Sequence, residues 1–376
     1  MKMNSVLRPL LLTIAALLFL TGCRDIAALS PSAPPAPADP VEALLSRLSP
    51  AEKVGQMMMV GLMTDTYDEN CAYLQNEFAM GSFILFDRNG DTAEKVHALT
   101  AALRKGSPTA VPLLIALDEE GGAVSRFTDF LPPPPAAKAL GEAGDSAAAK
   151  RCAADTARSL RALGINWNLA PVADLGLSDG RSYGDDPAIV TTFLQCAAAG
   201  YREENFPFCL KHFPGIGKGE ADTHDGDVAV ALSLEELRRE DLAPFAALVA
   251  DTPATDFAVM VGHVRYDAIE GVPASLSPAV VTDLLRDELH YDGVVLTDDL
   301  TMGAVAAHYT PEEAALRAIR AGCDLLLIGH GYEAETAAYN AILRALNTGD
   351  LPMERIDASV RRILRMKLAH VEAAKG

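Results

Sequence analysis

The sequence is poor in positive charge and lacks the spacings of a metal-binding protein. Its 376 residues carry 32 lysines and arginines against 51 aspartates and glutamates, which gives a formal net charge of −19. This balance argues against nucleic acid as a partner, because phosphate binding needs a basic face. The chain has no Cys-x-x-Cys and no His-x-x-x-His pair. Nothing in its spacing therefore predicts a metal site.

Cysteine and tryptophan are scarce. Five cysteines follow Cys23, an odd number that cannot all pair within one chain, and their spacing names no disulfide partners. Several stand in apolar or helical patterns, where a buried free thiol is the default interpretation. Trp167 is the only tryptophan, and we expect it to pack in or near the core.

The apolar run at the N-terminus is too short to cross a bilayer comfortably. Lys2 and Arg8 precede it, it extends from Pro9 to Leu20, and it leads into Thr21-Gly22-Cys23. This pattern predicts a signal peptide over residues 1–22. Its last four residues resemble the lipobox of bacterial lipoproteins, which implies that Cys23 is lipid-modified and becomes the new N-terminus. An ordinary cleaved signal followed by a chance cysteine is the alternative.

The segment that follows is rich in alanine, proline and serine. We expect residues 23–40 to be a lipidated cysteine with an extended tether, and residues 41–376 to form the folded body. The body would be held at a bacterial membrane outside the cytoplasm, in the periplasm or at the cell surface. Arg24 stands directly after Cys23, where lipoproteins retained at the inner membrane carry aspartate, so the leaflet stays open.

Apolar runs alternate with helical patterns along the body. Near-continuous apolar strands between helices are what a parallel sheet covered on its outer face requires. The sequence therefore predicts an α/β fold, specifically a single (β/α)8 TIM-like barrel. A doubly wound open sheet is the alternative, because periodicity does not show closure. The eight runs occupy residues 54–62, 81–86, 111–117, 165–172, 206–211, 257–262, 293–297 and 323–328, with helical stretches that include 91–103, 147–163, 187–204, 233–249 and 278–289.

Polar side chains stand where several of these runs end. In a barrel the C-terminal ends of the strands share one face, and active sites lie there. A scaffold gains nothing from crowding charges at one rim, so their convergence predicts a functional site. The residues are Asp118, Asp174, Lys211 with His212, His263 and Asp298.

The stretch from Lys211 to His224 reads KHFPGIGKGEADTH. Proline and three glycines make it a loop after a strand, and it presents Asp222 and His224. Alternate residues of an extended segment face the same side, so Asp222 can accept a hydrogen bond from one ring nitrogen of His224. The other nitrogen is then available to donate a proton. A histidine on a solvated loop is the alternative.

The stretch from Gly293 to Met302 reads GVVLTDDLTM. A carboxylate at this strand end can attack an anomeric carbon and form a covalent glycosyl-enzyme, as in retaining glycosidases. The two acids, Asp298 and Asp299, could instead cap a following helix over residues 300–307. Metal binding by the pair is a third option, without a supporting histidine pair or carboxylate cluster.

Together these motifs resemble the bacterial β-N-acetylglucosaminidases of glycoside hydrolase family 3. The likeness runs from about residue 45 to residue 370 and rests on the combination and order of the motifs. Besides the two stretches above they are LDEEGG from Leu117, GINWNLAPV from Gly164 with Asp174, RSYG from Arg181, and PASLS from Pro273.

The resemblance implies a role for each candidate residue. Asp298 corresponds to the nucleophile, His224 to the acid/base and Asp222 to its partner. The positions that would bind the hydroxyls of the sugar are Asp118, Arg126, Arg181, Lys211 and His212. We expect a monomer with a carbohydrate substrate and no cofactor, removing terminal β-linked N-acetylglucosamine from peptidoglycan- or chitin-type glycans.

Two departures from the family pattern leave the fine specificity open. Ile216 stands where the family commonly has a second histidine, and Ala123 stands where it often has arginine. The alternatives are a sugar-binding cell-wall lipoprotein with an inactive barrel, a β-glucosidase of the same family, and transfer to phosphate in place of water.

Overall fold

The computed structural model describes residues 39–216 and 228–371. Three predicted site residues, Cys23, Asp222 and His224, lie outside the described residues. One compact unit covers residues 40–376, and the fold that follows is the fold of that unit.

Eight parallel strands form one sheet. Each strand pairs with its neighbour in the sequence, and the order β10-β7-β5-β4-β3-β2-β1-β11 brings the last strand back against the first. An isolated parallel bridge between Leu296 and Leu325 joins the two remaining edges. The strands are β1 (Met58–Gly61), β2 (Ser82–Ile84), β3 (Leu114–Leu117), β4 (Trp167–Asn168), β5 (Phe208–Phe213), β7 (Phe257–Val261), β10 (Val294–Thr297) and β11 (Leu326–Ile328). The predicted barrel is therefore confirmed, and the open sheet is excluded.

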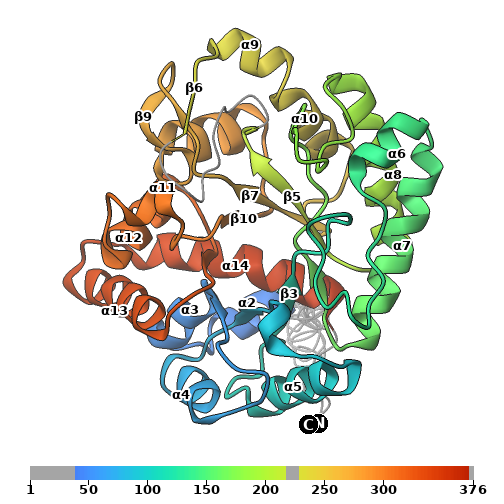
Figure 1. The fold of residues 1–376 in the computed structure, drawn as a ribbon. Coiled ribbons are helices and arrows are strands. Elements are labelled where there is room, and N and C mark those ends of the chain that lie inside the picture. Colours follow the sequence, from blue (N-terminus) through green and yellow to red (C-terminus); the bar gives the residue numbers. More distant parts are fainter. Residues whose placement is uncertain (1–38, 217–227, 372–376) are drawn as a thin grey trace, which may run out of the picture. The chain divides into compact units, whose positions relative to one another are not determined.

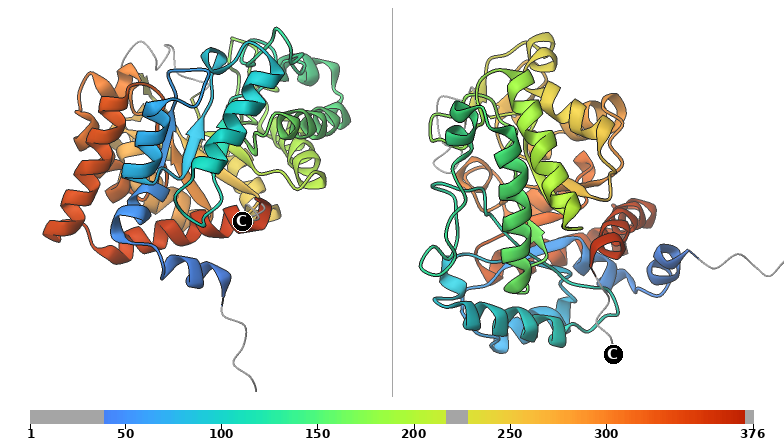
Figure 2. Two further views of the ribbon diagram at one scale, coloured as in Figure 1. Left: turned by 90° about the horizontal axis from the view of Figure 1, so that it is seen from below. Right: turned by 90° about the vertical axis from the view of Figure 1, so that its right-hand side faces the viewer.

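Helices surround the strands (Figures 1 and 2). The strand-to-strand connections contain α4 (Glu69–Phe78), α5 (Ala93–Gly106), α6 (Ala137–Ala143), α7 (Ser146–Ala162), α8 (Pro187–Glu203), α9 (Leu234–Arg239), α10 (Leu242–Asp251), the π-helix Ala279–Glu288, α11 (Gly303–Ala306) and α12 (Pro311–Ala321). Before β1 come α2 (Pro40–Leu45) and α3 (Pro50–Gln56), and after β11 come α13 (Tyr332–Thr348) and α14 (Met353–His370). None of the helices in the described ranges combines the length and apolar character needed to cross a membrane.

Three predicted elements differ from the structure. Of the run 165–172, only Trp167–Asn168 forms a strand, β4. The run 54–62 was expected to be one strand, but its first residues belong to α3. The reason is local: Ser49 accepts a hydrogen bond from the Glu52 N–H while Glu52 reaches back to Ser49, a capping box with Pro50 at the first helical position. The helical stretch 233–249 is two helices, because α9 ends at Arg239 and α10 begins at Leu242.

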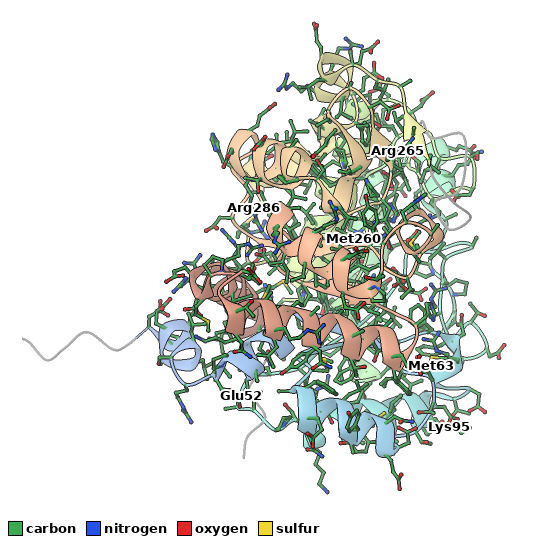
Figure 3. All side chains as sticks on the ribbon, turned by 90° about the vertical axis from the view of Figure 1, so that its left-hand side faces the viewer. Glu52, Met63, Lys95, Met260, Arg265 and Arg286 are labelled. Carbon is green, nitrogen blue, oxygen red and sulfur yellow. The ribbon has the colours of Figure 1, made fainter. Side chains whose placement is uncertain are left out.

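Apolar side chains fill the space between strands and helices (Figure 3), with Met260 of β7 inside and Lys95 of α5 at the outer surface. Trp167 is fully buried, as predicted. The five cysteines of the described body are free, and Cys71, Cys209 and Cys323 are buried. A separate three-stranded sheet, β6 (Ala229–Val230), β8 (Arg265–Tyr266) and β9 (Glu270–Pro273), is formed by the connections that follow β5 and β7.

Candidate active site

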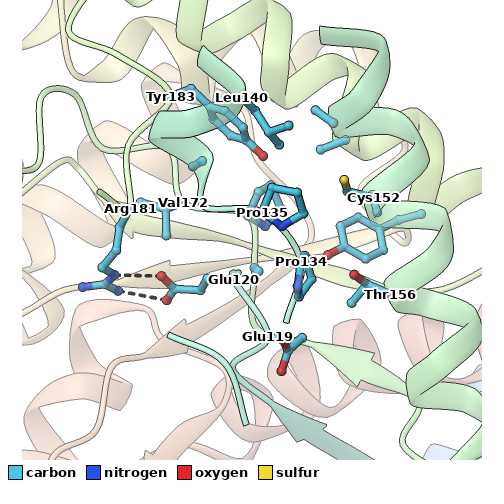
Figure 4. A pocket seen from close by; sticks show the side chains of 17 residues that line it. Glu119, Glu120, Pro134, Pro135, Leu140, Cys152, Thr156, Val172, Arg181 and Tyr183 are labelled. Atoms are coloured by element: carbon cyan, nitrogen blue, oxygen red, sulfur yellow. Dashed lines mark hydrogen bonds and ion pairs between the residues drawn. The ribbon is translucent and has the colours of Figure 1, made fainter. Parts of the chain in front are cut away.

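A network of charged side chains links the ends of β3 and β5. The ammonium of Lys211 lies 2.6 Å from Asp118 Oδ1 and 2.6 Å from Glu120 Oε1. Arg181 donates to both oxygens of Glu120, at 2.7 and 2.9 Å (Figure 4). Arg126 lies 3.5 Å from the other oxygen of Asp118. The five side chains alternate in sign, so each buried charge has a partner.

The network fixes the charge of its members. Burial works to raise the pKa of Glu120, but Lys211 and Arg181 outweigh it and hold that pKa at about 2. Burial works to lower the pKa of Lys211, and Asp118 with Glu120 outweigh it, so the pKa lies above its ordinary value. Lys211 is therefore an ammonium near neutral pH, although the residue is only 2% exposed. A permanent donor next to Asp118 suits the binding of a hydroxyl.

His212 is oriented by Asp174. The buried Asp174 carboxylate lies 2.7 Å from His212 Nδ1 and accepts from the backbone N–H groups of His212 and Ile216. Because a carboxylate only accepts, Nδ1 carries the proton in this contact. Asp174, predicted at a strand end, thus holds His212 and the backbone N–H of Ile216.

Asp298 lies directly after β10. Its backbone N–H donates to Val261 O at 2.9 Å, and its Oδ1 accepts from the Asp299 N–H at 2.8 Å. Burial works to raise the pKa of Asp298, but His212 and His263, helped by the Asp299 N–H and Lys211, hold it below its ordinary value. The side chain is partly exposed, so an ionised carboxylate is available to react.

The Asp299 side chain binds the backbone around the turn after β10. Its Oδ1 accepts from the N–H and hydroxyl of Thr301, at 2.9 and 2.7 Å, and from the N–H of Gly329 at 3.1 Å. The helix after it, α11, begins only at Gly303 with Met302 at its N-cap. The interpretation of the two acids as a helix cap was therefore wrong. Asp299 instead holds the turn that follows Asp298 through these hydrogen bonds.

A cleft of about 300 Å³ opens at this face. Of the predicted site residues, Asp118, Arg126 and Asp298 line it. Lys211 donates a hydrogen bond to Asp118, and His212 helps to lower the pKa of Asp298. Arg181 does not line this cleft. It lines a neighbouring pocket with Glu120. The remaining walls of the cleft are Ile84, Phe86, Met260, Asp299, Thr301, Met302, Gly303, Leu327 and His330.

Sequence reasoning missed Glu120 and His330. Glu120 stood inside the LDEEGG motif next to Asp118, so its position was a signal. His330 follows β11, in the place where the other strands carry polar residues, and its ring packs on Phe86 with centroids 4.9 Å apart. Across the described residues, no three His, Cys, Asp or Glu side chains are arranged to hold a metal ion.

Comparison with known proteins agrees with this geometry. The family model of the glycosyl hydrolase family 3 N-terminal domain matches residues 50–366. The chain therefore belongs to glycoside hydrolase family 3.

Three relatives carry related names. The β-hexosaminidase LpqI of Mycobacterium tuberculosis is 35% identical over 366 residues, which cover 92% of this chain and 91% of LpqI. A β-hexosaminidase of Stenotrophomonas maltophilia is 35% identical over 306 residues, 78% of this chain and 90% of that protein. The structure of a family 3 β-N-acetylglucosaminidase from Paenibacillus superposes with a TM-score of 0.81 and 37% identity over 88% of this chain. This chain covers 64% of that one.

Proposed function

We propose that the protein is a retaining β-N-acetylhexosaminidase that removes non-reducing terminal β-linked N-acetylglucosamine. The observation that carries the proposal is the ionised, partly exposed Asp298 in a cleft that also contains Asp118 and Arg126. A carboxylate poised to attack, beside charged groups that bind hydroxyls, is what glycoside hydrolysis through a covalent intermediate requires.

Asp298 attacks the anomeric carbon while His224, supported by Asp222, donates a proton to the departing oxygen. Water then hydrolyses the glycosyl-enzyme with His224 acting as base. The near-neutral reference pKa of imidazole suits both steps. This assignment of Asp222 and His224 rests on the family motif, since both lie outside the described residues.

The sugar-binding assignment divides between direct and supporting residues. Asp118 can accept hydrogen bonds from two hydroxyls, and Arg126 can donate beside it. Lys211 donates to Asp118, and Arg181 holds Glu120, the other carboxylate paired with Lys211. His212 is held separately by Asp174. The substrate we propose is a glycan of the peptidoglycan or chitin type. The protein would meet it outside the cytoplasm, anchored by a lipid at Cys23.

The test compares the full chain with its Asp298→Ala and Asp298→Asn variants on a chromogenic β-N-acetylglucosaminide. We expect turnover by the wild type and a loss of roughly a thousandfold or more in both variants, because the covalent step needs the carboxylate. The matching β-glucoside is the substrate control, and Asp292→Asn, at the exposed surface, is the variant control.

Each other outcome points to one alternative. Turnover of the β-glucoside at an equal rate would make the protein a β-glucosidase. Release of sugar phosphate when inorganic phosphate is added would make it a phosphorylase. A folded protein that binds N-acetylglucosamine and hydrolyses neither substrate would be a sugar-binding lipoprotein.

A further inference from the structure

A buried histidine near the proposed nucleophile takes no chemical step in the reaction proposed above, although it helps to lower the pKa of Asp298. His263 follows β7 and is 1% exposed. Its Nδ1 lies 2.8 Å from Ser275 Oγ, and its Nε2 lies 2.9 Å from the backbone oxygen of Asp299. The ring therefore bridges two segments of the chain, one at Ser275 and one at Asp299, the residue next to Asp298.

The partners of the ring decide which nitrogen carries the proton. A backbone carbonyl can only accept, so Nε2 must donate to Asp299 O. The other ring nitrogen, Nδ1, lies within hydrogen-bond distance of the Ser275 hydroxyl. Ser275 is fully buried, and its own N–H donates to Gly262 O at 3.0 Å. The backbone of the serine that contacts the ring is therefore bound to Gly262, directly after β7.

Asp299 connects the histidine to the nucleophile. Its N–H donates to Asp298 Oδ1 at 2.8 Å, while its carbonyl accepts from His263. Its side chain is held separately by Thr301 and the N–H of Gly329. Rotation of the Asp299 backbone would break the bond to Asp298. Two donors hold the Asp299 carbonyl oxygen: His263 Nε2 from a distant segment at 2.9 Å, and the Met302 N–H of the same turn at 3.0 Å.

We propose that His263 is a positioning residue for Asp298, which holds the Asp299 backbone in the orientation that fixes one carboxylate oxygen and leaves the other free to attack. The inference rests on the proposed function, because it takes Asp298 as the nucleophile. Its physical basis is geometric: a reacting group displaced by about 1 Å can lose roughly a hundredfold in rate.

Two substitutions separate the two contacts of the ring. In His263→Gln the amide nitrogen extends about as far as Nε2 and can still donate to Asp299 O. In His263→Asn it extends only as far as Nδ1, so it can meet Ser275 but cannot reach Asp299. We expect His263→Asn to lower kcat/KM roughly tenfold to a hundredfold and His263→Gln to keep it within about fivefold of the wild type.

A positioning role also predicts which constant changes. Inhibition by free N-acetylglucosamine reports binding of the sugar without the covalent step, and we expect its inhibition constant to stay within about twofold in both variants. The matched controls are His97→Gln and His97→Asn, since His97 is an exposed residue of α5. Thermal unfolding of every variant shows whether it is folded at the assay temperature.

Equal losses in the two variants, or a loss matched by weaker product binding, would overturn the proposal, because they indicate a packing role. If neither variant folds, Ser275→Ala keeps the ring and removes its orienting hydroxyl. We then expect a loss of about threefold to tenfold in kcat/KM with unchanged product inhibition, and an unchanged kcat/KM would overturn the proposal. A wild-type protein without turnover, or an active Asp298→Ala variant, would contradict the proposed function itself.

Discussion

Three consecutive carboxyl groups after β3 occupy three different environments. Asp118 lines the cleft, Glu120 is enclosed by Lys211 and Arg181, and Glu119 is buried under the loop that carries Arg126. Burial raises the pKa of Glu119 to about 7, against the opposing effects of the Arg126 N–H and the Ser125 hydroxyl, whereas ion pairs hold the pKa of Glu120 at about 2. Neighbours in the chain therefore differ by their partners, not by their chemistry.

The low pKa of Glu120 predicts a pH-dependent contribution to stability. A carboxyl group whose pKa falls from 4.5 to about 2 on folding stabilises the folded state by about 3 kcal/mol above pH 4.5. That contribution is lost as the pH falls from 4.5 toward 2. We expect Glu120→Gln to lower the free energy of unfolding, with a wild-type advantage that shrinks by about 1 kcal/mol between pH 7 and pH 4.

Urea unfolding of both proteins at the two pH values measures this difference. Glu94→Gln, at an exposed position of α5, is the control that should show no such change. A wild-type advantage that is independent of pH would mean that Glu120 contributes through packing alone.

At the scale of the elements, the strands set the position of the site and the turns after them set its detail. β1 and β11 lie so close at their ends that Gly61 touches the backbone of Gly329, and a Cβ added at Gly61 would collide with the Gly329 carbonyl. The Gly329 N–H in turn binds Asp299. The approach of two strands is therefore coupled to the turn that presents Asp298.

We expect Gly61→Ala to destabilise the protein by about 1–3 kcal/mol, because an overpacked contact forces the backbone to move. We also expect a lower kcat, because Gly329 would shift away from Asp299. Gly271→Ala is the matched control, since nothing lies near an added Cβ there, and it should change stability by less than about 0.5 kcal/mol. Thermal unfolding and the glycosidase assay measure both. Equal behaviour of the two variants would refute the coupling.

At the scale of the whole molecule, α14 binds the N-terminal part of the barrel through a buried lysine. Lys367 of α14 is fully buried and donates to Gln56 Oε1 and Gly81 O, at 2.7 and 2.8 Å. These contacts join the C-terminal helix to α3 and to the chain entering β2. Burial lowers the pKa of Lys367 to about 7. The two oxygens to which it donates, an amide and a backbone carbonyl, carry no formal charge.

The proposed lipid anchor at Cys23 is also a property of the whole molecule, because it would hold the enzyme at a membrane surface. When the full chain is produced in bacteria fed a labelled fatty acid, we expect the wild type to carry the label and to partition into the detergent phase. Cys23→Ala should lose both properties, since the sequence predicts Cys23 as the acceptor. Cys152→Ala is the control. An unlabelled wild type would favour an ordinary cleaved signal.

Much of this protein is determined by its sequence alone. Alternating apolar runs and helical patterns predict a parallel sheet covered by helices, because they follow from local periodicity. The polar residues at the strand ends identify the face of the candidate site, because parallel strands share one direction. The boundary between α3 and β1 was missed because a capping box outweighed the apolar run.

Only the tertiary structure decided which side chain each of these polar residues contacts. Arg181 meets Glu120 across 61 residues of sequence, and His263 reaches Asp299 across 36. No local pattern encodes such contacts, because they form only when the sheet closes and brings distant strand ends to one rim. The pKa values of the acids depend on the same partners. The sequence therefore determined which groups stand at the strand ends, and the closed barrel determined which of them lie in contact, because only closure brings distant strand ends to one rim.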